Sequence, residues 1–422
     1  MEHENDNRVY IGHRHEWSGD APFGIDIPAR RQHVYVIGQT GSGKSTLLRN
    51  LILQDIENGR GVAVIDPHGD LAADILEQIP PVRTNDVVYF DPADHHPLAI
   101  NLFRAAGDNW HLVASGIVSA FKKIWGNSWG PRLEYVLYAT LAALLQCDNT
   151  SLLGVSRMLY DEKYRAWVVK QVKDPMVKSF WVNEFANYDR GFRQEVIGPI
   201  QNKVGQLFLA PALRNVLGQV GTTVNFRFMM DRERIFIANL SKGLIGETQS
   251  NLLGALLVTG FELAALSRAD CPINERQDFF LYADEFHHYA TESFASILSE
   301  ARKYRLSLTL AHQYMGQLDE RISDAVFGNV GTLLAFRVSE ADGSVLERQF
   351  GGTLTRSQFT GLENYELCAR LLNQEPFFAR SFPPLETPRR RRKIVMRQAR
   401  QKYCKRQKWV EEKIDRWLKR RH

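Results

Sequence analysis

The sequence predicts an α/β protein: a parallel sheet covered by helices on both faces, an all-helical insertion, and a basic helical tail. Three observations lead to this fold class. Short β-branched runs alternate with helical patterns, the alternation is interrupted once by a long helical stretch, and positive charge gathers at the C-terminus. Strands buried on both faces are typically continuous apolar runs. The runs expected to form such strands are 33–38, 61–66, 86–91, 234–240, 278–284, 306–312 and 331–338.

Composition indicates an ordinary globular chain. The 422 residues are 44% hydrophobic and 24% charged, which allows two or three domains with ample cores. The four cysteines, at 147, 271, 368 and 404, are scattered and are expected to be reduced thiols of a cytosolic protein. The polar N-terminus lacks the apolar segment of a signal peptide. The longest apolar run, 252–267, is short for a membrane span and contains Glu262, so a buried core helix is expected and no membrane-spanning segment is predicted.

The order of patterns along the chain predicts three parts. The first thirty residues are too few for a domain and are expected to add a strand or two to the sheet. From about 108 to 221 the periodicity is helical, with no convincing strand. The expected boundaries are therefore 1–107 with 222–383 for the α/β domain, 108–221 for the all-α insertion, and 384–422 for a linker and basic helix.

The net charge of +5 conceals a strong asymmetry. Residues 389–422 contain 16 Lys and Arg but only 3 Asp and Glu, a net charge of +13, which leaves −8 on the rest of the chain. Such a tail can bind nucleic acid, an acidic protein or an anionic lipid surface. A solvated helix that binds nothing specific remains an equal alternative.

The strongest local pattern is a phosphate-binding loop after the first predicted buried strand. The segment 38–45, "GQTGSGKS", fits GxxxxGK[ST] between a buried strand and an amphipathic helix. Its backbone N–H groups and the helix N-terminus would hold phosphates, Lys44 would reach the β- and γ-phosphates, and Ser45 would ligate Mg²⁺. The predicted nucleotide-binding residues are Gly38, Gln39, Thr40, Gly41, Ser42, Gly43, Lys44, Ser45 and Thr46.

A pair of acids ends the predicted strand 278–284. Asp284 is expected to serve the Mg²⁺ that accompanies ATP, and Glu285 to act as general base on the attacking water. A site that only binds nucleotide needs the aspartate alone, so the second acid favours hydrolysis. The alternative is an acidic strand end that faces solvent.

Histidines near these motifs raise the question of a separate metal site. His287 and His288 follow the acidic pair, and His68 lies in "DPHGD" after another predicted strand. Zinc sites favour Cys and His at helical or knuckle spacing, which is not evident here. The favoured interpretation is that these histidines pack or form hydrogen bonds beside the nucleotide, with a dedicated metal site as the alternative.

The order of the motifs resembles the FtsK–HerA superfamily of DNA-pumping ATPases, and within it the TraG/TraD-type conjugative coupling proteins and their soluble type IV secretion relatives. The resemblance spans nearly the whole chain and rests on segments such as "VIDPHGDLA", "WGPRLEYVL", "PIQNKVGQLFL" and "LYADEFHHYATESFASILSEARKYRLSLTLAHQYMGQL". It implies a RecA-like nucleotide-binding sheet. It also implies that the helical insertion corresponds to the all-α domain of coupling proteins.

The resemblance also implies roles for three further residues. Gln313, after the strand 306–312, matches the glutamine that senses the γ-phosphate. Arg302 matches an arginine proposed to act on the nucleotide of a neighbouring subunit, and Arg31 is a weaker match to a second such arginine before the P-loop strand. The alternatives are a surface charge or ion pair for Arg302 and a simple strand-end amide for Gln313.

The resemblance implies an ATPase that forms a hexameric ring and moves single- or double-stranded DNA in conjugation or type IV secretion. The expected location is the cytoplasm, with peripheral attachment to the inner membrane as an alternative. Expected partners are DNA, further copies of the chain, and a relaxase, secretion-channel components or a nuclease. One alternative is a HerA-like translocase for DNA processing or defence that works with a separate nuclease. Another is a nucleotide-switched adaptor that binds a relaxase or membrane without pumping DNA.

Overall fold

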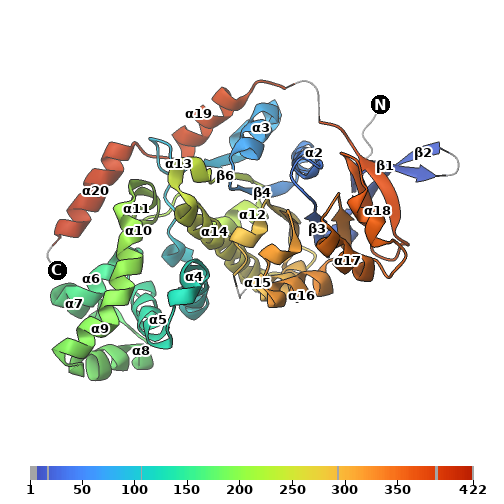
Figure 1. Ribbon diagram of the computed structural model, residues 1–422. Helices are drawn as coiled ribbons and strands as arrows, with labels where there is room; N and C mark the ends of the chain where they lie inside the picture. The colour runs from blue at the N-terminus through green and yellow to red at the C-terminus, as the bar shows by residue number, and fades with distance from the viewer. Residues whose placement is uncertain (1–6, 17–18, 106, 292–293, 385–387, 421–422) are drawn as a thin grey trace. The chain divides into compact units, whose positions relative to one another are not determined.

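The computed structural model describes residues 7–16, 19–105, 107–291, 294–384 and 388–420 (Figure 1). Two compact units are formed. The first takes in the chain up to Tyr89, 227–241 and 264–399, and contains the sheet. The second takes in 90–226, 242–263 and the chain from Arg400, and is helical. The predicted insertion, 108–221, lies inside the second unit.

The described part of the chain forms one 11-stranded mixed sheet in the order β2-β1-β11-β10-β9-β3-β8-β7-β4-β6-β5. The run from β9 to β6 is parallel, whereas β10, β11, β1 and β2 are joined by antiparallel pairings. The strands are β1 Arg8–Glu16, β2 Gly19–Asp26, β3 Val34–Ile37, β4 Gly61–Asp66, β5 Val87–Phe90, β6 Ile235–Asn239, β7 Phe279–Ala283, β8 Leu306–His312, β9 Thr332–Ala335, β10 Glu366–Arg370 and β11 Phe377–Ser381.

The α/β fold class predicted from the sequence is confirmed. All seven predicted strands are present, from β3 to β9, and every residue of each is buried. The first thirty residues supply β1 and β2, as expected. Strands β10 and β11, which widen the sheet by antiparallel pairing, were not predicted.

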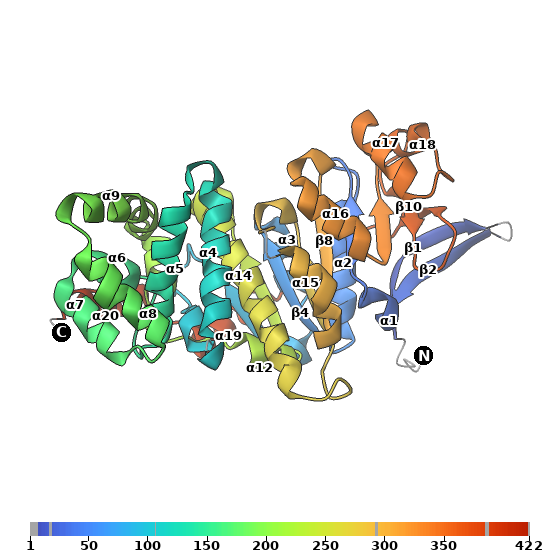
Figure 2. The same cartoon turned by 90° about the horizontal axis from the view of Figure 1, so that it is seen from below.

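Helices cover both faces of the sheet. Side chains of α2, α3 and α19 share one apolar core with β3, β4, β6 and β7. Figures 1 and 2 show α15 and α16 on the opposite face. The helices of this part are α1 Ile27–Arg30, α2 Lys44–Glu57, α3 Asp70–Gln78, α12 Phe226–Asp231, α15 Phe294–Glu300, α16 Glu320–Asn329, α17 Glu340–Gln349, α18 Arg356–Thr360 and α19 Arg392–Tyr403.

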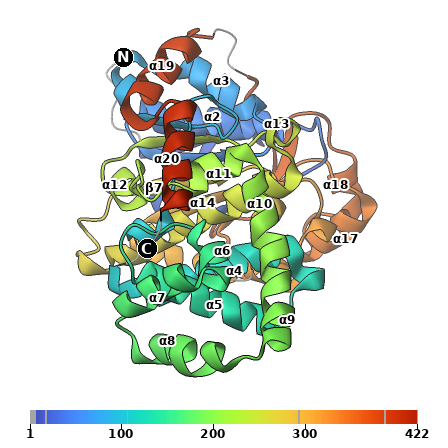
Figure 3. The same ribbon diagram turned by 90° about the vertical axis from the view of Figure 1, so that its left-hand side faces the viewer.

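The second unit is a bundle in which α5 packs on α4, α6 and α9 (Figure 3). Its helices are α4 Trp110–Trp125, α5 Pro131–Leu145, α6 Gly154–Tyr160, α7 Glu162–Gln171, α8 Pro175–Ser179, α9 Arg190–Ile200, α10 Gln206–Leu209, α11 Pro211–Leu217, α13 Lys242–Ile245, most of α14 Glu247–Ser267, and α20 Gln407–Lys419. Helix α14 is long and apolar enough to span a membrane, but 72% of its most apolar window is buried inside the protein. It is a core helix, as the sequence predicted.

The basic tail is folded onto the protein. The predicted linker falls partly on 385–387, outside the described residues. Helix α20 contacts α11, with Val410 and Ile414 buried. Arg157 of α6 donates hydrogen bonds to the carbonyls of Trp417 and Arg420, at 3.1 and 3.0 Å, and lies over the Trp417 ring. The Arg157 guanidinium thus lies at the negative C-terminal end of the α20 dipole, and the Lys and Arg side chains of α20 are exposed.

A buried histidine at the start of β3 gives the fold a pH dependence. His33 Nε2 donates to the Leu298 carbonyl at 3.0 Å and Nδ1 accepts the Leu308 N–H at 3.1 Å, an arrangement that requires the neutral ring. Burial lowers the pKa of His33 to about 4. Between pH 6.5 and 4 the unfolded chain therefore binds a proton that the folded chain does not, and stability falls as the pH falls.

We expect the free energy of unfolding to decrease between pH 7 and pH 5 by about 2 kcal/mol less in His33→Asn than in the wild type. Asparagine is chosen because His33 has φ +63°, a conformation that asparagine tolerates. The measurement is urea unfolding at both pH values. Equal pH dependence in the two proteins would show that His33 does not titrate in this way.

Candidate nucleotide-binding site

The phosphate loop lies between β3 and α2, as its motif predicts. Gly41 and Gly43 have φ of +80° and +121°, a region that favours glycine. A Cβ at Gly43 would lie 3.1 Å from the Tyr365 ring, so this side of the loop is closed by a neighbouring residue. Tyr365 also donates its N–H to the Ser42 carbonyl at 2.8 Å. The loop is thus held in place by β10 and its preceding turn.

Lys44 begins α2 and is buried within the loop. Its ammonium donates hydrogen bonds to the carbonyls of Gly38 and of Gln39, the latter at 3.0 Å. Burial lowers the pKa of Lys44, while the charges of Glu285 and Asp284 oppose this effect. Ser45, the next residue, is exposed at the helix N-terminus, where its hydroxyl is accessible to a metal ion. Thr46 is half-buried in the same turn.

Asp284 and Glu285 lie directly after β7, both buried. The pKa of Asp284 is raised to about 7 by burial and by the charges of Glu285 and Asp66, and Lys44 opposes this effect. Asp66 ends β4, the strand beside β7, and accepts the N–H groups of His68 and Ala72 at 2.8 and 2.9 Å. Carboxylates therefore gather at the ends of adjacent parallel strands, with Lys44 as the cation that acts on them.

This donor set fits Mg²⁺ that arrives with a nucleotide. Three carboxylates with one ammonium leave negative charge in a buried place, and a divalent cation would neutralise it. Asp284 and Ser45 are the residues that would hold the ion, directly or through water. No group of three or more His, Cys, Asp or Glu side chains arranged to bind a metal by itself is found in the described part of the chain.

Glu285 has the geometry of a group held for catalysis. Its backbone is left-handed, with φ +47° and ψ +46°, which costs a non-glycine residue about 1–2 kcal/mol. Gln313 at the end of β8 donates its side-chain amide to Glu285 Oε1 at 2.8 Å. The second oxygen, Oε2, is buried and accepts no hydrogen bond from the described residues. An oriented carboxylate with one unused acceptor can take a proton from water.

His287 lies between the side chains of Glu285 and Gln317. Its Nδ1 lies 3.4 Å from Glu285 Oε2, and its Nε2 lies 3.3 Å from the side-chain amide of Gln317. Gln317 also accepts the backbone N–H groups of Gln313 and Tyr314. Sequence reasoning missed Gln317 and Asp66. Asp66 could have been found, because parallel neighbouring strands place their C-terminal residues together, whereas nothing in the sequence distinguishes Gln317.

The two predicted trans-acting arginines lie elsewhere. Arg302 is exposed in the 3₁₀ turn Ala301–Tyr304, immediately before β8. Arg31 precedes β3 and forms two hydrogen bonds of 2.8 Å with the Asp278 carboxylate. Both are thus near the starts of strands whose ends carry the P-loop and Gln313. Arg31 is engaged inside its own chain, and its neighbour Arg30 is buried against Asp55 and Tyr282.

Comparison with known proteins supports the fold. The fold and site define a P-loop ATPase. Residues 9–112 match the family model described as "Helicase HerA, central domain". The plasmid coupling protein TrwB in complex with ADP and Mg²⁺ is similar in structure, with a TM-score of 0.63 and 14% identity over 87% of this chain and 90% of TrwB. VirB4 of Thermoanaerobacter pseudethanolicus has a TM-score of 0.58 and 14% identity over 88% and 96%.

No curated protein matches the chain in sequence. The predicted resemblance to FtsK–HerA-type ATPases of the coupling-protein kind is nonetheless confirmed by the family match and by these structures. At 14% identity the structures establish the fold, and the individual site residues rest on the geometry given above.

Proposed function

We propose that this protein is a ring-forming ATPase that uses hydrolysis to move DNA, in conjugative transfer or a related type IV secretion process. The observation that carries the proposal is the separation of Arg302 from the nucleotide. Gln313 lies at the end of β8, beside Glu285 at the end of the parallel strand β7, whereas Arg302 lies before the start of β8. Seven strand residues separate the two ends, about 20 Å, farther than an arginine side chain reaches. Arg302 cannot reach the nucleotide of its own copy, so the role that we propose for it is on the nucleotide of another copy.

Contacts of this kind are heterologous and close into a ring, for which we propose six copies. In the hydrolytic step, Lys44 and the loop N–H groups hold the phosphates. Asp284 and Ser45 are the residues that would hold Mg²⁺, and the ion would supply positive charge to the phosphate oxygens. Glu285 takes a proton from the attacking water, which Gln313 helps to orient. Arg302 of the adjacent copy stabilises the charge that develops on the γ-phosphate. Hydrolysis is thereby linked to assembly.

Two features support DNA as the cargo. TrwB, whose fold this chain shares, is described as a bacterial conjugative coupling protein. The tail also carries a net charge of +13 whose cations remain largely exposed, which suits contacts with a phosphate backbone. We place the protein in the cytoplasm or at the cytoplasmic face of the inner membrane. Relaxase and secretion-channel components are the proposed protein partners.

We expect ATP hydrolysis to be stimulated several-fold by DNA at low salt, and particles of six copies to form with a slowly hydrolysed ATP analogue. The measurements are the steady-state ATPase rate with single-stranded, double-stranded and no DNA, and particle mass with and without the analogue. An unstimulated ATPase that stays monomeric would contradict the proposal.

In a second candidate function the protein is again an ATPase that moves DNA, but it acts in a different cellular process. The match of residues 9–112 to the central domain of helicase HerA favours a translocase for DNA processing or defence that works with a separate nuclease. Co-purification from cells of a nuclease rather than a relaxase would favour this version. A nucleotide-switched adaptor is the third alternative, and it predicts that a protein unable to hydrolyse ATP still supports the cellular function.

A further inference from the structure

We infer that the sheet carries a second anion-binding site, built on Arg302 and Arg370, which receives the terminal phosphates of the nucleotide bound by an adjacent copy. The inference deepens the proposed ring mechanism and rests on it. Arg370 was not singled out by the sequence, and it adds a second guanidinium group to the one supplied by Arg302.

Both arginines line one cleft of about 560 Å³ at the edge where β3, β8 and β9 begin. The topology brings them together. Arg302 is followed by Lys303, Tyr304 and Arg305 before β8 begins at Leu306, and its charge acts on His33 at the start of β3. Arg370 ends β10, which runs antiparallel to β9 and pairs Arg370 with Leu333 near the start of β9. The P-loop lies at the opposite edge, after β3.

The chemistry of the lining favours an anion. Its polar side chains are the two arginines, one serine and the amides of Gln32, Asn329, Asn373 and Gln374, and no described residue of the lining is Asp or Glu. Neither arginine forms an ion pair with a described residue. Burial lowers the pKa of Arg370 with no acid to oppose it. Uncompensated guanidinium groups beside amide donors form a site for the oxygens of a phosphate.

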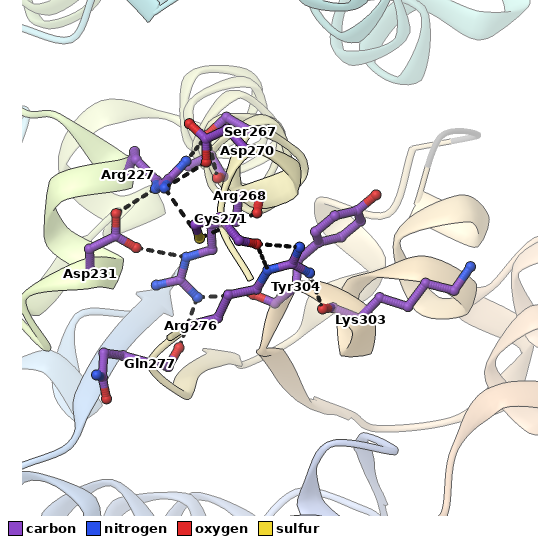
Figure 4. Close-up of polar contacts among 11 residues, drawn as sticks. Arg227, Asp231, Ser267, Arg268, Asp270, Cys271, Arg276, Gln277, Lys303 and Tyr304 are labelled. Atoms are coloured by element: carbon purple, nitrogen blue, oxygen red, sulfur yellow. Dashed lines mark hydrogen bonds and ion pairs between the residues drawn. The ribbon is translucent and has the colours of Figure 1, made fainter. Parts of the chain in front are cut away.

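The turn that carries Arg302 is held by hydrogen bonds to the next two residues, Lys303 and Tyr304 (Figure 4). Arg276 donates to the Lys303 carbonyl at 2.5 Å, and Arg268 donates to the Tyr304 carbonyl at 2.9 Å. Arg268 is itself fully buried and paired with Asp231 at 2.9 Å. Two arginine side chains thus hold the turn that presents Arg302, so less entropy is lost when Arg302 meets a phosphate.

Arg370 is held in a similar way. Its NH1 donates to the Gln349 carbonyl at 2.6 Å, which directs the half-buried guanidinium while leaving its other N–H groups for a ligand. The inference requires a head-to-tail ring in which the starts of these strands face the nucleotide edge of the next copy. A γ-phosphate that reaches the cleft would meet two guanidinium groups.

The test is the ATPase of assembled Arg370→Ala at saturating DNA. We expect kcat to fall about 10- to 100-fold with KM for ATP nearly unchanged, because the substrate is bound by the other copy. Arg370→Lys should recover part of the loss. Arg348→Ala, an exposed arginine outside the cleft lining, is the matched control and should behave as wild type. Thermal unfolding and binding of a fluorescent ATP analogue verify folding.

The decisive measurement is the ATPase activity of a mixture of two variant proteins. Neither Arg370→Ala nor Glu285→Gln should hydrolyse ATP well alone, but mixed rings contain interfaces with an intact Glu285 facing an intact Arg370, and activity should rise above both parents. Wild-type kcat in Arg370→Ala would overturn the inference while leaving DNA-stimulated ring ATPase intact. If Arg370→Ala lost DNA affinity but kept a normal kcat at saturating DNA, the inference would also be overturned, because the cleft would then bind DNA phosphates. A wild type that does not assemble would overturn the ring mechanism and this inference together.

Discussion

Glu285→Gln should abolish ATP turnover but retain nucleotide binding. The carboxylate is buried, held by Gln313 on one oxygen, and its other oxygen lies 3.4 Å from His287 Nδ1 without accepting a hydrogen bond from the described residues. It is therefore the group placed to accept the proton of the attacking water. The amide is nearly isosteric but cannot accept that proton, and we expect kcat to fall about 10²- to 10⁴-fold. Steady-state ATPase measures the loss, and equilibrium binding of a fluorescent ATP analogue should remain within a few-fold of wild type.

Asp324→Asn is the matched control, because it changes an exposed acid on α16 to its amide and should leave kcat unchanged. A Glu285→Gln protein with more than a tenth of wild-type kcat would exclude Glu285 as general base. Loss of nucleotide binding as well would mean that Glu285 supports the loop rather than the chemistry.

Arg302→Ala should have an effect of similar size for a different reason. The arginine would stabilise the charge that develops on the phosphate of another copy, a contribution of about 10³-fold or more in related phosphoryl-transfer reactions. We expect kcat to fall by about 10³-fold while each copy still binds ATP through its own P-loop. Lys303→Ala is the matched control, since Lys303 is the exposed neighbour in the same turn and contributes its carbonyl to the Arg276 contact.

Because Arg302 and Glu285 would act from different copies at one interface, a second measurement can test this prediction. When inactive Arg302→Ala and inactive Glu285→Gln proteins are mixed, one interface in the ring combines an intact Glu285 with an intact Arg302. ATPase activity should therefore reappear. Two inactive proteins that stay inactive on mixing, although they assemble together, would show that Arg302 does not act across the interface.

The parts of the fold predicted from the sequence are those with a strong local signal. The seven predicted strands are continuous apolar runs, and the P-loop and the Asp284–Glu285 pair are compact motifs with required flanking elements. Strands β10 and β11 were not predicted because their sequences, "ELCAR" and "FFARS", are short and only partly buried. They also pair antiparallel, at one side of the sheet. Their consequence is functional, since β10 places Arg370.

Other site features depend on tertiary contacts that no short pattern encodes. The charge of the tail was evident, but the docking of α20 depends on Arg157, about 260 residues away in sequence. The pairing of Arg31 with Asp278 likewise joins residues 247 positions apart. The role of Arg31 in trans stays a prediction, and its ion pair would have to open before Arg31 could reach another copy.

The most direct test of the central claim is DNA movement itself. Displacement of streptavidin from biotinylated DNA ends can be measured for single- and double-stranded DNA, with ATP and with a slowly hydrolysed analogue. We expect ATP-dependent release that Glu285→Gln and Arg302→Ala both lose. If wild-type rings hydrolyse ATP in response to DNA but release no streptavidin from either kind of DNA at any end, the protein does not move DNA and the account is wrong.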